Sequence, residues 1–481
     1  MAAGGGLDYA RSVIVKSSMS EALDAAALAV AQSKGLTTAQ MQTLAQQYFN
    51  ANYRQNSDYG TPVAVTVTKS GQVVTVATSC AMPTTLLQVA GLSTLTINAT
   101  SSVTYGQTKL WVSLVLDNTG SMVQSDGTGL SKMSALKSAS HSLLSMLQGA
   151  TSTDGDIQVA IIPFARDVFL GTSYVNSSWL SFTDFKAEPP SKPGSNYGPS
   201  VSNNNNINNN CPWTDQTDHY HCQANKTNGS AQISKIQSNG LICPSLNTYT
   251  RHYYNGCYDS VYNSTTKTYS HTWTGNDKST WTGCVTDRGT STAPTSSTDY
   301  DVTVTTPTAS TANSMMVAEN GDQACPGSTV MGLSYDWTTL NSAVDSMVAN
   351  GSTNQAIGLV WGWHAMTQGA PLSAPTLPDN TQRIIILLSD GLNTQDRWSG
   401  DGSNQSSAVD ARMAYACANA KAAGITIYTV FVDINGAQGN SSVLQSCATD
   451  SSKYYDLTSS SQIATAFADI GQQITNLRVT Q

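Results

Sequence analysis

Charged residues are scarce in this sequence, and long apolar runs are absent from it. Asp, Glu, Lys and Arg make up only 11% of its 481 residues, whereas about a quarter is usual in soluble domains. Ser, Thr, Asn and Gln must therefore provide the polar surface, a balance that suits secreted and cell-surface proteins better than cytosolic ones. Because no run of about eighteen apolar residues occurs, we expect no part of this chain to span a membrane unaided.

Basic clusters and common catalytic motifs are also missing. Lys and Arg number 23 against 31 Asp and Glu, a formal net charge of −8. No basic run could follow a phosphate backbone, so we expect no binding to nucleic acid. The sequence contains no His-Glu-x-x-His, no Gly-x-Ser-x-Gly and no P-loop. These absences favour a protein that is not an enzyme.

Nine cysteines occur without a repeated Cys-x-x-Cys. This pattern predicts disulfides formed in an oxidising compartment. Since the count is odd, at least one cysteine stays unpaired, and Cys80, alone among strand residues, is the candidate. Cys417 lies on a predicted helix before one strand, and Cys447 follows the next short helix. Neighbouring helices on one sheet face can bring such positions within bridging range, so we predict a disulfide between them.

The most informative stretch is an apolar run that begins at Leu110 and stops at Asp117, followed by hydroxyls at Thr119 and Ser121. The apolar run predicts a strand buried on both faces, as in a parallel sheet. The polar side chains then lie on the loop that leaves the strand's carboxyl end, where open α/β sheets place ligands. A carboxylate and two hydroxyls suit hard cations such as Mg²⁺, Mn²⁺ or Ca²⁺. Taken alone, the same residues could form an ordinary polar turn.

Two later stretches supply matching groups. Thr353 lies in a loop between two helical patterns, and a second buried strand ends at Asp390. The three pieces together resemble the von Willebrand factor A (VWA) domain and its metal-ion-dependent adhesion site (MIDAS), which is Asp-x-Ser-x-Ser followed by a distant Thr and a distant Asp. Thr119 stands where Ser is usual and keeps the hydroxyl. The resemblance implies that one Mg²⁺ (or Mn²⁺/Ca²⁺) is held jointly and that a protein partner's carboxylate completes its shell. The residues implied are Asp117, Thr119, Ser121, Thr353 and Asp390.

Residues 1–108 form a separate helical α+β region in this interpretation, with a long Ala-rich helix, a second helix and three strands. The stretches 7–11 and 22–29 resemble the N-terminal part of TadG-like (Flp/Tad pilus assembly) proteins of bacteria. In that family the first helix continues from a membrane-spanning segment, and a VWA domain often follows. The resemblance implies a cell-envelope protein that is membrane-anchored through an N-terminal segment missing or truncated here, with the VWA domain outside the cytoplasm. The alternative is an Ala-rich helix that merely packs.

Residues 109–481 alternate strands with helices, which predicts an α/β fold with a doubly wound, mostly parallel sheet, VWA- or Rossmann-like. Two strands, 157–164 and 167–170, fit the VWA arrangement, in which one antiparallel edge strand joins the parallel sheet.

Regular patterns vanish from residue 171 to 332, a stretch rich in Asn, Ser, Thr and Cys. We predict a disulfide-rich insertion that the sheet does not need for folding and that selects the partner. Its dense Tyr and Trp residues either form a binding surface or pack a small core. We expect no zinc at the sequence from His219 to Cys222, which lacks a second Cys/His pair. Six cysteines allow several pairings, which stay open: Cys211, Cys222, Cys243, Cys257, Cys284 and Cys325.

The sequence thus predicts a cell-envelope pilus-assembly or adhesion protein that binds a divalent metal and a protein partner, with pilus or envelope components as partners. The alternative is a purely structural envelope scaffold with a non-functional metal site.

Overall fold

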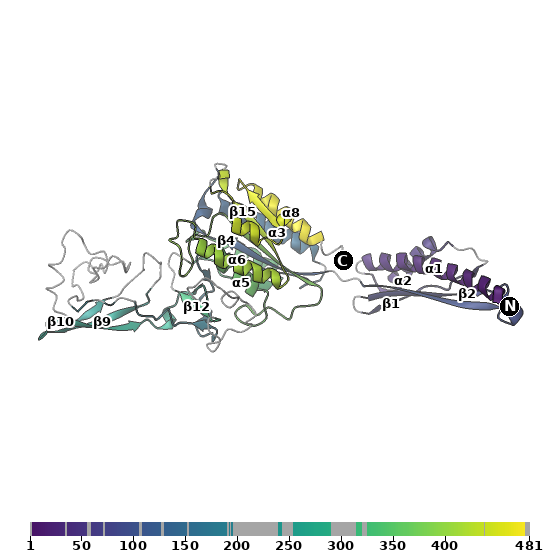
Figure 1. Cartoon of the computed structure of the whole chain (residues 1–481), viewed down its shortest axis with the longest axis horizontal. Helices are drawn as coiled ribbons and strands as arrows, with labels where there is room; N and C mark the ends of the chain where they lie inside the picture. Colours follow the sequence, from purple (N-terminus) through teal and green to yellow (C-terminus); the bar gives the residue numbers. More distant parts are fainter. Residues whose placement is uncertain are drawn as a thin grey trace. The chain divides into compact units, whose positions relative to one another are not determined.

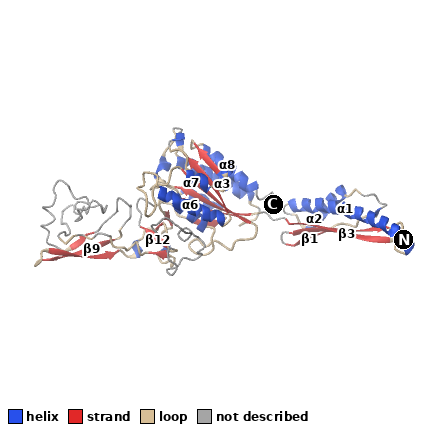
Figure 2. Ribbon diagram, in the orientation of Figure 1, coloured by secondary structure: helices blue, strands red, loops and turns tan. Residues whose placement is uncertain are grey.

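The computed structural model (Figures 1 and 2) consists of two compact units, residues 1–107 and residues 108–480. It describes residues 2–33, 36–54, 59–70, 73–104, 108–126, 129–151, 153–189, 192, 194–195, 239–242, 254–289, 314–319, 325–436 and 438–476.

The first unit packs two helices on a three-stranded antiparallel sheet of order β1-β2-β3. Thr37 caps the second helix in a capping box with Gln40, which satisfies backbone groups that a helix end leaves free. Buried side chains such as Leu23, Phe49 and Val76 join helices and sheet in one core. The elements are α1 (Ala2–Gln32), α2 (Thr38–Asn52), β1 (Thr66–Ser70), β2 (Val73–Pro83), the 3₁₀ turn η2 (Leu87–Ala90) and β3 (Thr94–Thr104).

Cys80 of this unit is a free cysteine, as predicted, and it is buried. Among the described residues, no helix combines the length and the apolar character needed to cross a membrane.

The second unit is built on a six-stranded sheet of order β13-β5-β4-β14-β15-β16. All neighbouring strands are parallel except β13, which runs antiparallel to β5 at the edge. All residues of β4 after Lys109 are buried, as are the last six of β14, which is why both strands contain apolar runs. The strands are β4 (Lys109–Asp117), β5 (Ile157–Phe164), β13 (Met331–Ser334), β14 (Thr381–Ser389), β15 (Ile425–Val432) and β16 (Tyr454–Leu457).

Helices cover both faces of this sheet, as Figure 2 shows. Leu110, Val112 and Leu114 of β4 face a core formed with α3 (Lys132–Ala150), α4 (Trp337–Asp345) and α8 (Gln462–Asn476). Trp111 and Val115 face the opposite core, formed with α5 (Gln355–His364), α6 (Ser407–Ala422) and α7 (Ser442–Cys447). The alternation along β4 therefore divides one strand between two cores.

The predicted disulfide between Cys417 of α6 and Cys447 of α7 is confirmed, with a Cα–Cα distance of 5.1 Å. It joins neighbouring helices on one face of the sheet, which is the arrangement predicted from the sequence.

The assignment of residues 167–170 as the antiparallel edge strand of this sheet is wrong. Residues 168–169 form β6 (Val168–Phe169), which pairs with β11 (Cys284–Thr286) in a separate sheet of order β6-β11-β12-β7. A tight turn between β5 and β6, in which Ala165 N donates to Asp167 O at 3.0 Å, carries the chain away from the six-stranded sheet. The edge strand is β13, whose first two residues fall inside the predicted insertion.

The segment 171–332 also contains more regular structure than predicted. It contributes β7 (Leu180–Ser181), β11 and β12 (Met316–Glu319) to the four-stranded sheet. A further sheet of order β10-β9-β8 consists of β8 (Gly240–Ile242), β9 (Gly256–Asn263) and β10 (Thr268–Gly275). Trp179, Trp281 and Val285 of this segment lie in the same core as α5 and the six-stranded sheet.

One disulfide of this segment, Cys284–Cys325, is described, with a Cα–Cα distance of 5.9 Å. Cys211, Cys222 and Cys243 lie outside the described residues, as do His219 and the rest of the sequence that was considered for zinc.

Candidate metal centre

The candidate site lies where β4 and β14 end side by side. The two strands are parallel neighbours, with Leu116 opposite Leu388, so Asp117 and Asp390 leave the sheet at the same edge. The chain runs from β4 to β5 on one side and places β14 on the other. Ligands of open α/β sheets bind at such a switch point, outside the carboxyl ends of the strands.

The loop after β4 is held in a compact turn by the first acid. Thr119 N donates to Asp117 Oδ1 at 2.7 Å, and the chain then enters the 3₁₀ turn η3 (Gly120–Val123). Gly120 N donates to Gly351 O at 2.9 Å, and Asn350 N donates to Asn118 O at 2.6 Å. These backbone bonds place the loop that carries Thr353 beside the loop that carries Thr119 and Ser121.

Three of the predicted residues are in direct contact. Ser121 Oγ donates to Asp390 Oδ1 at 2.6 Å, and Thr119 Oγ1 lies 3.0 Å from Ser121 Oγ and 3.5 Å from the same carboxylate oxygen. Asp117 is linked to the second strand through Ser389, whose hydroxyl donates to Asp117 Oδ2 at 2.6 Å. Asp117, Thr119 and Asp390 are buried, whereas Ser121 is partly exposed.

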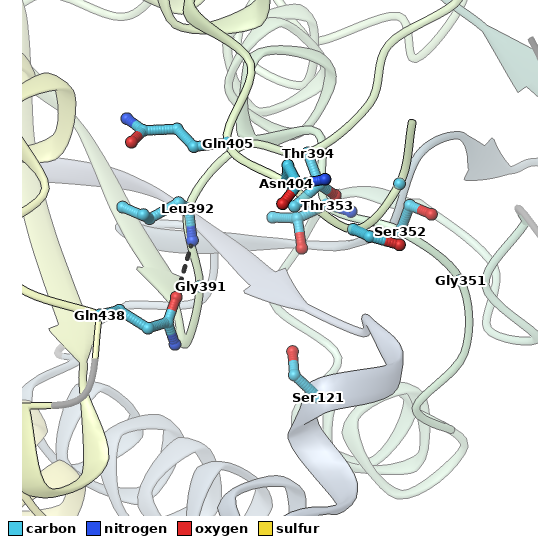
Figure 3. A pocket seen from close by; sticks show the side chains of 12 residues that line it. Ser121, Gly351, Ser352, Thr353, Gly391, Leu392, Thr394, Asn404, Gln405 and Gln438 are labelled. Carbon is cyan, nitrogen blue, oxygen red and sulfur yellow. Dashed lines mark hydrogen bonds between the residues drawn. The ribbon is translucent and has the colours of Figure 1, made fainter. Parts of the chain in front are cut away.

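Thr353 faces the same space from the opposite side. A pocket of about 390 Å³ has Ser121 and Thr353 in its wall, together with Gly391 and Gln438. Figure 3 shows the hydroxyls of Ser121 and Thr353 pointing toward one another across it. Thr353 is fixed by its backbone, since its N–H donates to Thr394 Oγ1 at 3.0 Å and its carbonyl accepts from Thr394 N at 2.9 Å. Its side chain is therefore left to face the pocket.

The two buried carboxylates, Asp117 and Asp390, repel each other when both are ionised. Burial, and next the charge of Asp390, raise the pKa of Asp117 to about 7, although hydrogen bonds from Ser389 and Thr119 act in the opposite direction. A cation bound between the acids would favour their ionised forms. The donor set thus fits a divalent cation on electrostatic grounds.

The chemical type of the donors narrows the choice of cation. Among the described residues, no group of three or more His, Cys, Asp or Glu side chains could hold a metal ion. A metal at this edge would rely on two carboxylates and on the hydroxyls of Thr119, Ser121 and Thr353. All are hard oxygen donors, which suit Mg²⁺, Mn²⁺ or Ca²⁺ rather than softer metals.

Sequence reasoning missed three residues that shape this site. Lys132, buried at the start of α3, donates from Nζ to Asp390 Oδ2 at 2.8 Å. Gln438 Nε2 donates to Asp390 O at 2.8 Å. Its Oε1 accepts from Leu392 N at 3.2 Å, the bond that Figure 3 marks with a dashed line. Ser389 bridges to Asp117. One signal for Lys132 was available, because a cation at the first position of a helix opposes the helix dipole and indicates a nearby acid.

The sequence matches no protein-family model and no curated protein. Among solved structures, it is similar to the pilus adhesin SpaC from Lactobacillus rhamnosus GG, with 11% identity and a TM-score of 0.33 over 85% of this chain and 34% of that one. It is also similar to the vWF domain of the type V pili tip protein Mfa5 from Porphyromonas gingivalis, with 10% identity and a TM-score of 0.34 over 78% of this chain and 98% of that one. The PilB minor pilin from Streptococcus sanguinis has 12% identity and a TM-score of 0.32, over 87% of this chain and 79% of that one. This chain spans about a third of the length of SpaC, and likenesses this distant carry no functional argument by themselves.

Proposed function

We propose that residues 108–480 form a VWA domain whose metal-ion-dependent adhesion site binds one Mg²⁺, or Mn²⁺ or Ca²⁺ in its place, and through it a carboxylate of a protein partner. The observation that carries the proposal is the contact between Ser121 Oγ and Asp390 Oδ1, at 2.6 Å between residues 269 positions apart. The mostly parallel sheet with helices on both faces and one antiparallel edge strand supports the doubly wound architecture that the sequence resemblance implies.

Each predicted residue has a part in this proposal. Asp117 and Asp390 would supply negatively charged oxygens to the ion, and the hydroxyls of Thr119, Ser121 and Thr353 would supply neutral oxygens. When bound, the metal would offer a coordination position to an acidic side chain entering the pocket. Apart from Leu392, the residues that line that pocket carry hydroxyls or amides or are glycines. None of them is charged, so the metal would be the group that selects for an anion.

We propose binding rather than catalysis. Both oxygens of Asp117 accept hydrogen bonds, from Thr119 N and Ser389 Oγ. Both oxygens of Asp390 are also engaged, by Ser121 and Lys132. Neither acid is among the described residues that line the pocket, and the lining side chains are hydroxyls, amides and one leucine, none of them a usual general base.

For the whole chain we propose a role in bacterial pilus assembly or adhesion at the cell envelope. The support is the resemblance of residues 7–11 and 22–29 to TadG-like proteins, together with disulfides at Cys284–Cys325 and Cys417–Cys447, which form in oxidising compartments. In this proposal an N-terminal segment holds the protein at the membrane, and pilus or envelope components are its partners. Fractionation of native cells tests this, and a protein found wholly in the cytosol would refute it.

One observation favours a second candidate, a structural envelope scaffold without a bound metal. The Lys132 ammonium already supplies a positive charge to Asp390 at 2.8 Å. An ion pair of this kind can stabilise a buried acid without any metal.

Calorimetric titration of the metal-stripped full chain with Mg²⁺ and Mn²⁺ separates the two candidates. The adhesion site predicts saturable binding that weakens at least about tenfold in Ser121→Ala, since changes around a bound metal commonly have effects of this size. Ser138→Ala, at an exposed position of α3, is the matched control and should bind as the wild type does. No binding to the folded wild type at millimolar ion would leave the scaffold as the surviving candidate.

A further inference from the structure

The Lys132 ammonium occupies a fixed position on one side of the candidate metal centre. Its side chain is 1% exposed, and Nζ lies 2.8 Å from Asp390 Oδ2. Its backbone is held as well, because Lys132 N donates to Gln124 O at 2.9 Å, and Nζ lies 3.3 Å from Gln124 Oε1. The lysine is therefore anchored at both ends to the segment that follows the Thr119 and Ser121 loop.

The two oxygens of Asp390 divide the site into two sides. Oδ1 faces the hydroxyls of Ser121 and Thr119, which are predicted metal ligands, and Oδ2 faces Lys132. A metal on the hydroxyl side and the ammonium on the other side would share this one carboxylate. Like charges that share a partner in a buried site repel one another strongly, because little water screens them.

The charges at this site do not cancel when a divalent ion is bound. When both are ionised, Asp117 and Asp390 carry two negative charges, of which the Lys132 ammonium balances one. The site without a metal thus needs only one further positive charge, and a divalent ion brings two. With the ion bound, one positive charge remains unbalanced in a site whose acids are buried.

We propose that Lys132 makes metal binding and anion binding depend on each other at this site. It weakens the binding of a divalent cation to the site alone and creates the excess positive charge that a partner's carboxylate neutralises. This inference rests on the proposed metal-dependent adhesion function and adds a residue to it. Lys132 acts through Asp390, so it is a positioning residue that sets the charge of the site.

The position of Lys132 supports a specific role rather than ordinary packing. It is the first residue of α3, where the aligned backbone N–H groups disfavour a cation. A buried lysine there is unfavourable unless a carboxylate accepts it. Lys137 on the same helix is different, since it is partly exposed and its Nζ donates to Asp345 O at 2.8 Å.

The test titrates the metal-stripped full chain with Mg²⁺ in three solutions, containing no additive, acetate as the carboxylate, or acetamide as its neutral analogue. For the wild type we expect acetate to tighten Mg²⁺ binding about tenfold, within the usual range for coupling between two sites, and acetamide to have no effect. For Lys132→Met we expect Mg²⁺ to bind about tenfold more tightly than to the wild type without any additive, and acetate to add little. Lys137→Met should behave as the wild type.

Two additional measurements separate this role from a structural one. Thermal melts in EDTA and in Mg²⁺ should show a larger Mg²⁺-dependent rise in Tm for Lys132→Met than for the wild type. Lys132→Arg, which keeps the charge, should restore the dependence on acetate. If Lys132→Met does not fold, Lys132→Gln takes its place in the same comparisons, because it removes the charge and keeps a hydrogen-bond donor for Asp390.

The outcomes distinguish this inference from the function on which it rests. If the wild type binds no Mg²⁺, the proposed adhesion site itself fails. If the wild type binds Mg²⁺ equally well with and without acetate, or if folded Lys132→Met binds it no more tightly, the role of Lys132 is wrong and the metal site stands.

Discussion

The side-chain amide of Asn354 donates a hydrogen bond of 2.8 Å to Asp287 Oδ2, which joins the residue after Thr353 to the segment after β11. The same nitrogen donates to Arg166 O at 3.1 Å. Arg397 N and Nη1 also donate to Asp287, to Oδ2 at 3.3 Å and to the backbone oxygen at 2.9 Å. Asn354, Asp287 and Arg166 are all buried. Part of the segment 171–332 therefore supports the loop that carries Thr353.

This contact changes what we expect from deleting the segment. Removing all of 171–332 would take Trp179, Trp281 and Val285 out of the core that they share with α5. Losses of single large core side chains cost about 3–5 kcal/mol each, and whole domains are stable by only about 5–15 kcal/mol. We expect the complete deletion to prevent folding of the sheet, contrary to the sequence-based expectation that the segment is dispensable.

A shorter deletion should be tolerated. Gly275 lies against Lys186, since a Cβ built on Gly275 would be 2.8 Å from Lys186 O. Residues 188–274 can thus be replaced by a short Gly/Ser linker between points that are already close. The deletion removes four cysteines and leaves the Cys284–Cys325 and Cys417–Cys447 pairs. We expect a cooperative thermal transition and unchanged Mg²⁺ binding, and an unfolded product would show that β9 and β10 belong to the core.

The larger elements were predictable because their sequence patterns repeat over enough residues. β4 and β14 each span nine residues, and each contains an apolar run, Leu110–Leu116 interrupted only by Ser113 and Ile384–Leu388 without a break, as expected for strands covered on both faces. β6 and β7 contain two residues each, and β11 contains three. No periodicity can be recognised over so few positions, so the four-stranded sheet was missed.

The candidate site was only partly predictable for a different reason. Asp117, Thr119 and Ser121 follow a strand at fixed spacing, and Asp390 follows a second strand, so their meeting is implied by a parallel sheet. Lysine is usually exposed, and only the folded chain places Lys132 beside an acid 258 residues later. The contact between Asn354 and Asp287 likewise joins a helix start to an irregular segment, and no local pattern encodes it.

The stability of the metal-free protein should depend on pH through Asp117. Its pKa is raised from 3.8 to about 7 in the folded chain, so between these values the folded state binds a proton that the unfolded state releases. Stability through this group therefore falls as pH rises from about 4 to about 7. In EDTA we expect Tm to fall along this range, and in Mg²⁺ the metal-dependent gain in Tm should grow with pH, because the metal requires the ionised form.

Asp117→Asn provides the control for that experiment. It removes the titrating group, so the slope of Tm against pH in EDTA should become flatter and the gain from Mg²⁺ should vanish. A variant with the slope of the wild type would assign the pH dependence to other acids.

The disulfide between Cys417 and Cys447 should contribute substantially to the second unit. It closes a loop with a sequence separation of 30, for which the chain-entropy relation gives about 3–4 kcal/mol. Both cysteines are buried, so we test the double variant Cys417→Ala/Cys447→Ala by denaturant unfolding. The midpoint should shift to lower denaturant in the transition of the second unit. Cys80→Ala, in the first unit, should leave that transition in place, and an unchanged midpoint in the double variant would show that the bridge adds little.

The first unit should become less stable in acid through Asp8. Its carboxylate accepts hydrogen bonds of 2.9 Å from the backbone N–H groups of Thr85, Leu86 and Leu87. These bonds, that of Leu87 first, hold the pKa of Asp8 below its usual value of 3.8. A carboxylate whose pKa is lowered in the folded state stabilises the protein at pH values above its unfolded pKa. This contribution to stability is lost as the pH falls through the folded pKa.

Asp8→Asn should therefore lower the Tm of the first unit at neutral pH, and the difference from the wild type should shrink as the pH falls below about 4. Asp24→Asn, at an exposed position of the same helix, should have little effect at either pH. If Asp8→Asn and Asp24→Asn melt alike at neutral pH, the contact between α1 and the turn at η2 does not stabilise the unit.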